Sequence, residues 1–322
     1  MNKMLQTGEV VHHYVVVAPK GDGTYGAVFE VQDTTTNALN VALKILTATS
    51  PIADTRFRAE NGHLHTLKGH DSVISPTTHV LDIGGKTFYC MELADTNVDK
   101  YISSKALGND EAIGIFKNVC EGLSHAHNNG IVHRDLHLGN VLLMTADPAQ
   151  ASPRVTDFGM AKDFNGMNIS SIPASVWGAV EIRPPEIFFM LWPTAELEEY
   201  IRSDIYALGI LLHNLFDVRP TAYLFGLINS VVSHLWSKGV LVDGQTFQID
   251  PTVDDVSRKQ FYDEWLSIYD RTNQDKLAVT LREPNPALEV EVNRIIQKCC
   301  EPDYNDRYMT VDELLTDVSA IC

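Results

Sequence analysis

The chain has 322 residues, of which 44% are hydrophobic and 21% are charged, so it holds enough apolar material for a sizeable core and is not bulk disordered. Its net charge of −17 disfavours nucleic acid and anionic membranes as partners, because their phosphates repel an acidic chain. Residues 1–10 show no signal-peptide pattern, the longest apolar stretch (205–212) is too short to span a bilayer, and the five cysteines lack zinc-type spacing, so we expect a cytoplasmic protein with reduced thiols.

The first third of the chain has the pattern of a small sheet with one helix. Residues 54–68 place apolar side chains at near-helical spacing. Five segments around this helix are rich in β-branched and apolar residues and are expected strands: 14–17, 27–31, 41–46, 78–83 and 86–91.

After Glu92 the pattern becomes helical. Helices are expected over 110–128, over 205–216 with Asp204 near its start, and over 311–321. The sequence therefore predicts an α+β protein with a small β-rich lobe, residues 1–92, followed by a larger helical lobe, residues 93–322.

Three glycines between the first two expected strands form a G-x-G-x-x-G-x-V pattern: Gly21, Gly23 and Gly26, with Val28 behind them. Glycines allow backbone N–H groups to approach phosphate oxygens closely. A dinucleotide-binding fingerprint has the same spacing but is followed by a helix, whereas a strand follows here. A plain hairpin turn is the alternative reading of this pattern taken alone.

Lys44 lies between apolar neighbours on the next expected strand. A lysine in that place can hold phosphates in a cleft, although an exposed strand lysine is common. Glu60 on the following helix can pair with the Lys44 ammonium and fix its position.

Two further motifs follow in order. Residues 133–140 read His-Arg-Asp-Leu-His-Leu-Gly-Asn, and Asp157-Phe158-Gly159 comes shortly after. With the glycine loop and Lys44, these motifs give a sequence that resembles the eukaryotic-type protein kinase family over about residues 14–321. The resemblance implies a bilobal protein-kinase-like fold that uses ATP and Mg²⁺ to phosphorylate a protein substrate.

The resemblance also assigns roles to individual residues. It implies that Asp135, preceded by Arg134, is the base that accepts the proton of the substrate hydroxyl, and that Asn140 and Asp157 are the Mg²⁺ ligands. It implies that Leu64, His133 and Phe158 stack in a regulatory hydrophobic column. The residues implied to surround adenine are Val28, Ala42 and Leu142 at its faces, Met91 as gatekeeper, and the hinge from Glu92 to Ala94.

Three later residues match large-lobe positions of the same family. Glu186 follows two prolines in an imperfect Ala-Pro-Glu motif, Asp204 matches the aspartate that opens the central helix and braces the catalytic loop, and Arg307 matches the arginine that pairs with the Glu186 position. Each alone reads as an ordinary surface or capping residue.

Two positions depart from the family pattern. His137 stands where serine/threonine kinases usually carry lysine, and Ala179 stands where they usually carry threonine. The tyrosine-kinase pattern is not met either, since it requires Arg at Gly139 and Pro at Ala179. Family base rates favour a serine/threonine acceptor over tyrosine. Because a neutral imidazole holds a phosphate oxygen less well than an ammonium, we expect a lower turnover than in a typical kinase.

Arg134 before Asp135 is the pattern of kinases that are switched by phosphorylation of the activation loop. Ser170, Ser171 and Ser175 are the candidate acceptors, and the plainer reading is that they are solvated loop serines.

Two other functions remain open. The first is a small-molecule phosphotransferase of the aminoglycoside-kinase type, which His137 fits but Arg134, Phe158 and the Glu186–Arg307 pair do not. The second is a pseudokinase or docking module, which the His137 and Ala179 substitutions favour and the retained Lys44, Asp135, Asn140 and Asp157 disfavour.

Overall fold

The structure is a computed structural model. It describes residues 5–23, 26–35, 40–145, 152–165, 183–191, 196–217, 222–241, 249–250, 252–272 and 277–322. Contacts within the chain divide it into two compact units, Met1–Tyr101 with Gly139–Ala161, and Ile102–Leu138 with Lys162–Cys322. These units do not test the predicted lobe boundary at residue 92, which stays a prediction.

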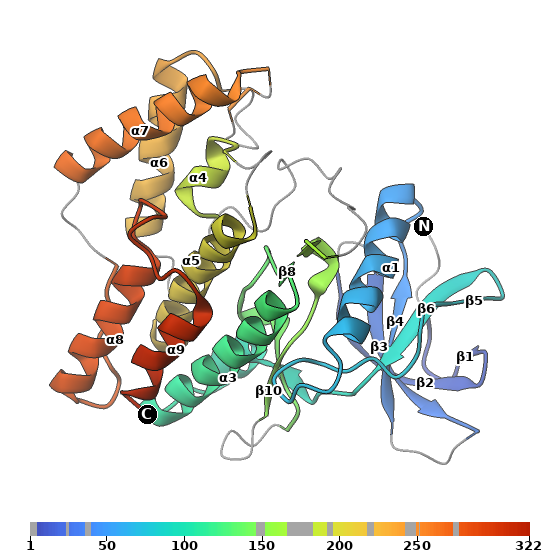
Figure 1. Ribbon diagram of the computed structural model, residues 1–322. Coiled ribbons are helices and arrows are strands. Elements are labelled where there is room, and N and C mark those ends of the chain that lie inside the picture. Colours follow the sequence, from blue (N-terminus) through green and yellow to red (C-terminus); the bar gives the residue numbers. More distant parts are fainter. Residues whose placement is uncertain are drawn as a thin grey trace. The chain divides into compact units, whose positions relative to one another are not determined.

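The first unit contains a six-stranded sheet in the order β1-β2-β3-β4-β6-β5, with every neighbouring pair antiparallel (Figure 1). All five expected strands are present, and two have the predicted bounds. The strands are β1 Val10–Val11, β2 Tyr14–Asp22, β3 Gly26–Asp33, β4 Val41–Leu46, β5 Leu81–Ile83 and β6 Lys86–Met91.

The helix of the first unit, α1 Pro51–Thr66, begins three residues before its predicted start. Ser50 caps it, since the Ser50 hydroxyl accepts a hydrogen bond from the Ala53 N–H at 3.1 Å, and Pro51 occupies the first turn, where no N–H is needed. These two residues extend the helix beyond the apolar periodicity on which the prediction depended.

The register of the sheet separates its two faces. In an antiparallel pair, residues opposite each other point to the same face, and alternate residues of a strand share a face. One face buries an apolar cluster: Val16, Ala27, Phe29, Val31, Leu43, Ile45, Phe88 and Cys90. The partners Val28 and Lys44, and Ala42 and Met91, belong to the opposite face.

A second, three-stranded sheet also belongs to the first unit. Its order is β10-β9-β7, and its strands are β7 Thr96–Asn97, β9 Val141–Leu143 and β10 Pro153–Val155. Directly after β10 comes a short 3-10 turn, Phe158–Met160, against which α1 packs.

The second unit is mostly helical. The helices α3 Asn109–Asn128, α5 Leu197–Phe216, α8 Pro286–Cys299 and α9 Val311–Ser319 pack on one another, while α4 Pro185–Phe188, α6 Ala222–Ser237 and α7 Asp255–Thr272 form a further group (Figure 1). A two-stranded ribbon, β8 Ile131–Val132 with β11 Lys162–Asp163, lies beside α3 and α5. The helix α2 Val98–Ser104 runs across the division between the units. The α+β class is confirmed.

The central helix α5 is longer than predicted. It begins at Leu197, so the expectation that Asp204 opens this helix is wrong, and Asp204 lies inside it. The extra turns start at a capping box in which the Glu199 carboxylate accepts the Glu196 N–H at 3.0 Å. Farther along, a Cβ built on Gly209 would lie 2.5 Å from Cys300 Sγ, so only glycine allows α5 to approach α8 this closely.

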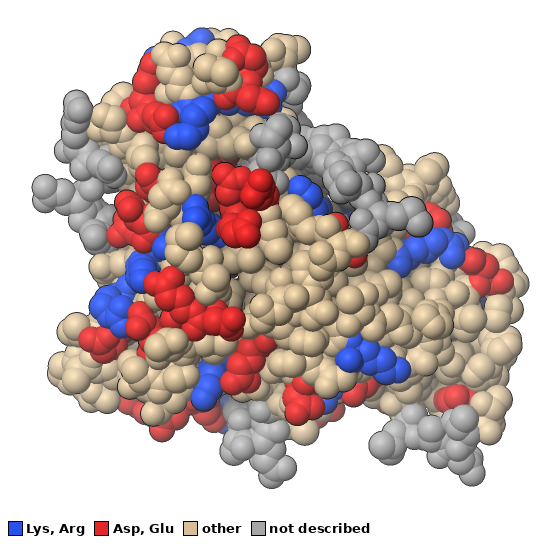
Figure 2. Space-filling model, in the orientation of Figure 1, with Lys and Arg blue, Asp and Glu red and all other residues tan. Residues whose placement is uncertain are grey.

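Surface charge differs between the two units on the face shown in Figure 2, and the cysteine thiols are free. On the face in Figure 2, Asp and Glu are more numerous over the helices of the second unit than over the first unit. All five cysteines are free, and burial raises the pKa of the Cys90 thiol to about 12. Among the helices in the described part of the chain, none is both long and apolar enough to cross a membrane.

Candidate active site

The glycine pattern joins β2 to β3, as predicted. Gly21 lies opposite Val28, and the Gly23 N–H donates to the Gly26 carbonyl at 2.8 Å. A Cβ on Gly26 would lie 2.7 Å from the Ile45 carbonyl oxygen of β4, so glycine is required where these two strands meet. Residues 24 and 25 lie outside the described part of the loop.

Lys44 and Glu60 form the ion pair that the sequence predicts. Lys44 Nζ lies 2.5 and 2.7 Å from the two Glu60 oxygens, and the side chains are only 14% and 4% exposed. Lys44 also lies 3.5 Å from Asp157 Oδ1. Burial alone would lower the pKa of Lys44, but the Asp157 and Glu60 carboxylates together hold that pKa above its ordinary value. The lysine therefore stays charged at neutral pH.

The Lys44 face of the sheet also carries most of the predicted adenine contacts. Ala42 and Met91 are buried opposite each other, and Val28, the partner of Lys44, is only partly buried. Leu142 on β9 is likewise partly buried. The exposed parts of Val28 and Leu142 are apolar, which suits the flat faces of a base.

The segment after Met91 is held by polar contacts. The Glu92 N–H donates to the Ser75 carbonyl at 3.1 Å, and the Glu92 carboxylate accepts the Ser75 N–H at 2.8 Å. Arg154 on β10 forms an ion pair with the same carboxylate. Ala94 is buried, and the next residue, Asp95, donates its N–H to the Leu143 carbonyl at 3.1 Å.

Asp157 and Asn140 lie on neighbouring segments of the first unit. The Thr156 N–H donates to the Asn140 carbonyl at 3.0 Å. Asp157 has left-handed backbone angles, φ 63° and ψ 60°. For a residue other than glycine, this conformation costs about 1 kcal/mol. Its carboxylate is 45% exposed, so it is open to a ligand while it also faces Lys44.

Asp135 and Arg134 belong to the second unit, where Asp204 fixes the backbone that leads into Asp135. The Asp204 carboxylate accepts the N–H groups of His133 and Arg134, each at 2.8 Å. His127 Nε2 donates to the same carboxylate at 2.8 Å. Burial alone would raise the pKa of Asp204, but the His127 hydrogen bond and the Arg134 N–H help to hold it below its ordinary value. The bracing role expected of Asp204 thus has a geometric basis, with Arg134 at φ 64°.

Arg134 also has a basic neighbour. Burial first, and then the charge of Arg134, lower the pKa of Lys162. The Lys162 ammonium lies 4.0 Å from the ring centre of Tyr200 and 4.4 Å from that of Phe164. The positive charges of Arg134 and Lys162 therefore repel each other within the second unit.

The predicted Glu186–Arg307 pair is present and fully buried. Two hydrogen bonds join the groups at 2.7 and 2.9 Å, and neither side chain is exposed. This pair links α4 to the loop before α9.

Some expectations fall where the structure describes little or nothing. Ala179 and the candidate phosphorylation sites Ser170, Ser171 and Ser175 lie outside the described residues. His137 is described and partly exposed.

Four partners of the site residues were not predicted from the sequence. Tyr89 donates its hydroxyl to Glu60 at 2.9 Å. His63 contacts the Phe158 carbonyl, Arg154 pairs with Glu92, and His127 binds Asp204. Each pairing joins distant segments, so no local pattern signals it.

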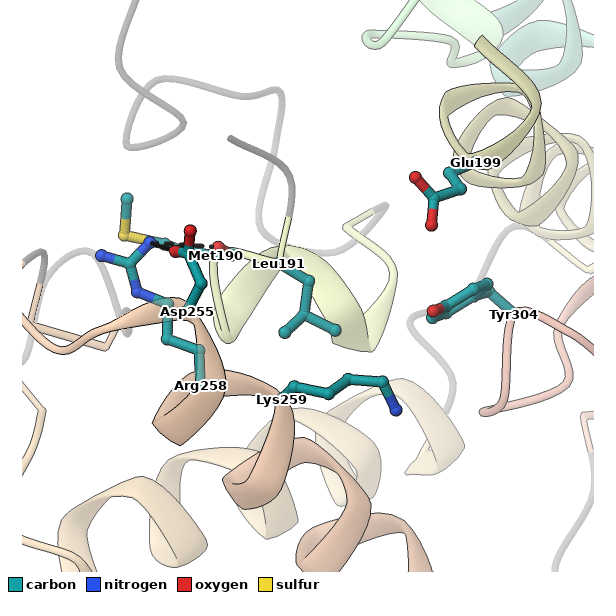
Figure 3. Close-up of a pocket in the computed structure, with 7 residues that line it drawn as sticks. All are labelled: Met190, Leu191, Glu199, Asp255, Arg258, Lys259 and Tyr304. Carbon is teal, nitrogen blue, oxygen red and sulfur yellow. Dashed lines mark hydrogen bonds and ion pairs between the residues drawn. The ribbon is translucent and has the colours of Figure 1, made fainter. Parts of the chain in front are cut away.

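A pocket of about 210 Å³ lies elsewhere in the second unit. Figure 3 shows Leu191, Lys259 and Tyr304 pointing toward the same space, with Glu199 at its edge. Its other described lining residues are Met190, Asp255 and Arg258. Two carboxylates and two cations line it, so its charge favours neither an anion nor a cation, and it contains none of the predicted site residues.

Comparisons with known proteins agree with this geometry. The family model "Protein kinase domain" matches residues 14–318. The chain is 27% identical over 98% of its length to a probable serine/threonine-protein kinase PknB of Lactococcus lactis, and 28% identical over 64% to serine/threonine-protein kinase A of Synechocystis. It is 23% identical over 76% of its length to the G-type lectin S-receptor-like serine/threonine-protein kinase RKS1 of Arabidopsis thaliana.

The chain spans less than half of the length of each of these three relatives, 43%, 40% and 28%. The family match covers the glycine loop, the Lys44–Glu60 pair, the Asp135 and Asp157 motifs and the Glu186–Arg307 pair. The chain belongs to the protein kinase domain family.

Proposed function

We propose that this chain is an ATP-dependent protein kinase that transfers the γ-phosphate of Mg-ATP to a serine or threonine hydroxyl of a protein substrate. The observation that carries the proposal is Lys44, a charged lysine held between the Glu60 and Asp157 carboxylates on the apolar sheet face that includes Val28, Ala42 and Met91. The names of the relatives support a serine/threonine acceptor over tyrosine.

In this proposal the first unit holds the nucleotide. Backbone N–H groups of Gly21, Gly23 and Gly26 approach the phosphates, and Lys44 binds the α- and β-phosphates. The base packs between Val28 with Ala42 and Leu142, and its polar edge meets the backbone from Glu92 to Ala94. Because Glu60 and Tyr89 fix the ammonium beforehand, the lysine needs little reorganisation when ATP binds.

Asn140 and Asp157 fit a magnesium site. They supply an amide oxygen and a partly exposed carboxylate on adjoining segments, and Mg²⁺ is commonly bound by one or two protein oxygens together with phosphates and waters. The described residues contain no cluster of three or more His, Cys, Asp or Glu side chains suited to a metal. Bound Mg²⁺ would supply neutralisation of phosphate charge; the two residues would orient it.

Asp135 is the proposed base. Its carboxylate accepts the proton as the substrate oxygen attacks the γ-phosphorus and the bond to the β-phosphate oxygen breaks. Asp204 holds the backbone of His133 and Arg134, and thereby fixes the start of the Asp135 loop. This arrangement supports a catalytic protein over a pseudokinase, because the residues for positioning and proton transfer are retained.

Arg134 supports the further proposal of a phosphorylation switch. Arg134 and Lys162 act on each other electrostatically, and an added phosphate near them would relieve the repulsion between their charges. Ser170, Ser171 and Ser175 remain the candidate acceptors. Intact-mass analysis after incubation with Mg-ATP is expected to show added phosphate in the wild type, and the absence of any added mass would argue against autophosphorylation.

The test of the main proposal is transfer of label from ATP to a mixed panel of protein substrates in the presence of Mg²⁺, with Asp135→Asn as the inactive control. We expect phosphoserine or phosphothreonine after acid hydrolysis, lost in the control. Phosphotyrosine would change the acceptor class. Label on an aminoglycoside-type small molecule alone, or nucleotide binding without transfer, would overturn the proposal in favour of the two other functions.

A further inference from the structure

His63 connects α1 to the turn that contains Asp157. Its Nδ1 lies 3.2 Å from the Phe158 carbonyl oxygen, and the side chain is only 7% exposed. A carbonyl oxygen only accepts hydrogen bonds, so His63 must carry a proton on Nδ1. The contact therefore selects one tautomer of the ring, which solution spectroscopy can detect.

The Phe158 carbonyl is a central acceptor in this turn. It also accepts the Ala161 N–H at 3.1 Å, which closes the 3-10 turn directly after Asp157. Because Asp157 itself has left-handed backbone angles, the turn is strained and depends on surrounding contacts to persist. His63 supplies one of these contacts from outside the turn.

Glu60 and His63 act on the same turn from one face of α1. They are three residues apart on the helix, so their side chains lie close together on one side. Glu60 reaches Asp157 through Lys44, and His63 reaches the next residue, Phe158, directly. Movement of α1 would therefore change both contacts at once.

We propose that His63 is a positioning residue that holds the Asp157 turn and couples the aim of the Asp157 carboxylate to the position of α1. The proposal rests on the proposed function only for its effect on catalysis, since the effect on the turn is a property of the first unit alone. The competing explanation is that His63 is a core histidine that fills space and contributes to stability alone.

The matched control is Asn61 on the same helix. It is 3% exposed, and its Nδ2 donates to a carbonyl at 3.0 Å, but that carbonyl belongs to Thr78 rather than to the Asp157 turn. Asn61→Leu thus removes a partly buried hydrogen bond from a buried side chain of the same helix without touching the turn. His63→Leu removes the donor, and His63→Asn keeps a side-chain N–H near the position of Nδ1.

The first experiment is amide hydrogen exchange of the nucleotide-free protein. Loss of one hydrogen bond is worth about a tenfold change in an opening equilibrium, so His63→Leu is expected to speed exchange of the Ala161 N–H about tenfold relative to Asn61→Leu. His63→Asn is expected to restore much of the protection. Equal exchange at Ala161 in the two leucine variants would show that His63 is only a packing residue.

The second experiment is ¹⁵N spectroscopy of the wild type, which is independent of whether any variant folds. The Nδ1–H tautomer of His63 is expected, and the Nε2–H tautomer would overturn the proposal.

Kinetics supply the third readout. His63→Leu is expected to lower kcat about tenfold, with the KM for the protein substrate unchanged, while Asn61→Leu stays within about twofold of the wild type. If the wild type transfers no phosphate but Ala161 and the tautomer behave as expected, the proposed function fails and the positioning of the turn by His63 stands. An unchanged kcat in an active wild-type background would refute the coupling to catalysis.

Discussion

Arg307 and Glu186 lie 121 residues apart in the chain and form a bidentate ion pair from which solvent is excluded. Arg307 also donates to the carbonyls of Glu301 and Arg202, at 2.8 and 3.1 Å. The pair thus joins α4, α5 and the loop before α9 within the second unit.

Removing one partner of this pair is expected to be severe. Arg307→Met leaves the Glu186 carboxylate buried without its cation, which typically costs about 3–5 kcal/mol of the free energy of unfolding. Chemical denaturation of the variant measures the loss. The double variant Arg307→Met, Glu186→Leu is expected to be less destabilised than the sum of its single variants, and simple additivity would contradict a coupled pair.

Lys44 is expected to matter for transfer more than for folding. Lys44→Met removes the charge that we propose binds the phosphates and is expected to lower kcat/KM about 100-fold or more. Lys86→Met is the matched control, because Lys86 lies in the same sheet and pairs with Glu9 at 2.6 Å but is partly exposed. Similar losses of activity in both variants would place the defect in the sheet rather than in phosphate binding.

The Arg154–Glu92 ion pair is expected to tune the affinity for ATP. Arg154→Met removes this ion pair, so that the Ser75 N–H is the contact of the Glu92 carboxylate that remains among the described residues, and the segment proposed to meet the adenine edge is held less firmly. We expect the KM for ATP to rise about three- to tenfold while kcat changes little, because one partly exposed contact between charged groups contributes only a modest free energy. An unchanged KM would show that Glu92 is fixed by Ser75 without Arg154.

His137 offers a gain-of-function test. Lysine keeps its positive charge at neutral pH and can donate a charge-assisted hydrogen bond to a phosphate oxygen. His137→Lys is therefore expected to raise kcat by about two- to tenfold, in line with a charge-assisted hydrogen bond to phosphate. A variant no faster than the wild type would show that His137 does not limit turnover.

Because of the buried His213, we expect the free energy of unfolding to decrease in mild acid. It is buried on α5, and burial lowers its pKa below the ordinary 6.5, against the opposing effects of Asn214 and Asp217. Above pH 6.5 the ring is neutral in both the folded and unfolded states, so the full stability is present. As pH falls below 6.5 toward the lowered pKa, the unfolded state binds more protons, and stability falls by up to about 1.4 kcal/mol per pH unit.

His213→Leu removes this dependence. Urea denaturation at several values of pH between 5 and 8 compares it with the wild type. As pH falls, the free energy of unfolding of the wild type is expected to decrease relative to that of the variant. A difference that stays constant across this range would mean that His213 has the same pKa in the folded and unfolded states.

Local sequence pattern was sufficient for much of the fold and for two ion pairs that the motifs imply. The bounds of β4 and β6 follow from their apolar runs, and the Lys44–Glu60 and Glu186–Arg307 pairs follow from the family motifs. The start of α5 was missed because its first turn is polar and is capped by glutamates rather than by Ser or Thr.

The contacts around these motifs were not predictable in the same way. Tyr89 reaches Glu60 because of the register between β4 and β6, and His63 reaches Phe158 because α1 packs on the Asp157 turn. Both contacts depend on long-range geometry, and neither residue type signals a partner by itself. Motifs thus pointed to the charged groups of the candidate site, whereas side chains such as Tyr89 and His63 that contact this region became evident only in three dimensions.

The left-handed backbone at Asp157 decides how an inactive version of this protein should be made. Asparagine adopts that conformation readily, and alanine does so only at an energetic cost. Asp157→Asn would therefore remove the negative charge and leave the main chain as it is, whereas Asp157→Ala would combine the chemical change with a rebuilt loop. Under the proposed function, an inactive reagent for finding binding partners of this protein should carry asparagine at position 157, because the backbone of the turn would then stay native.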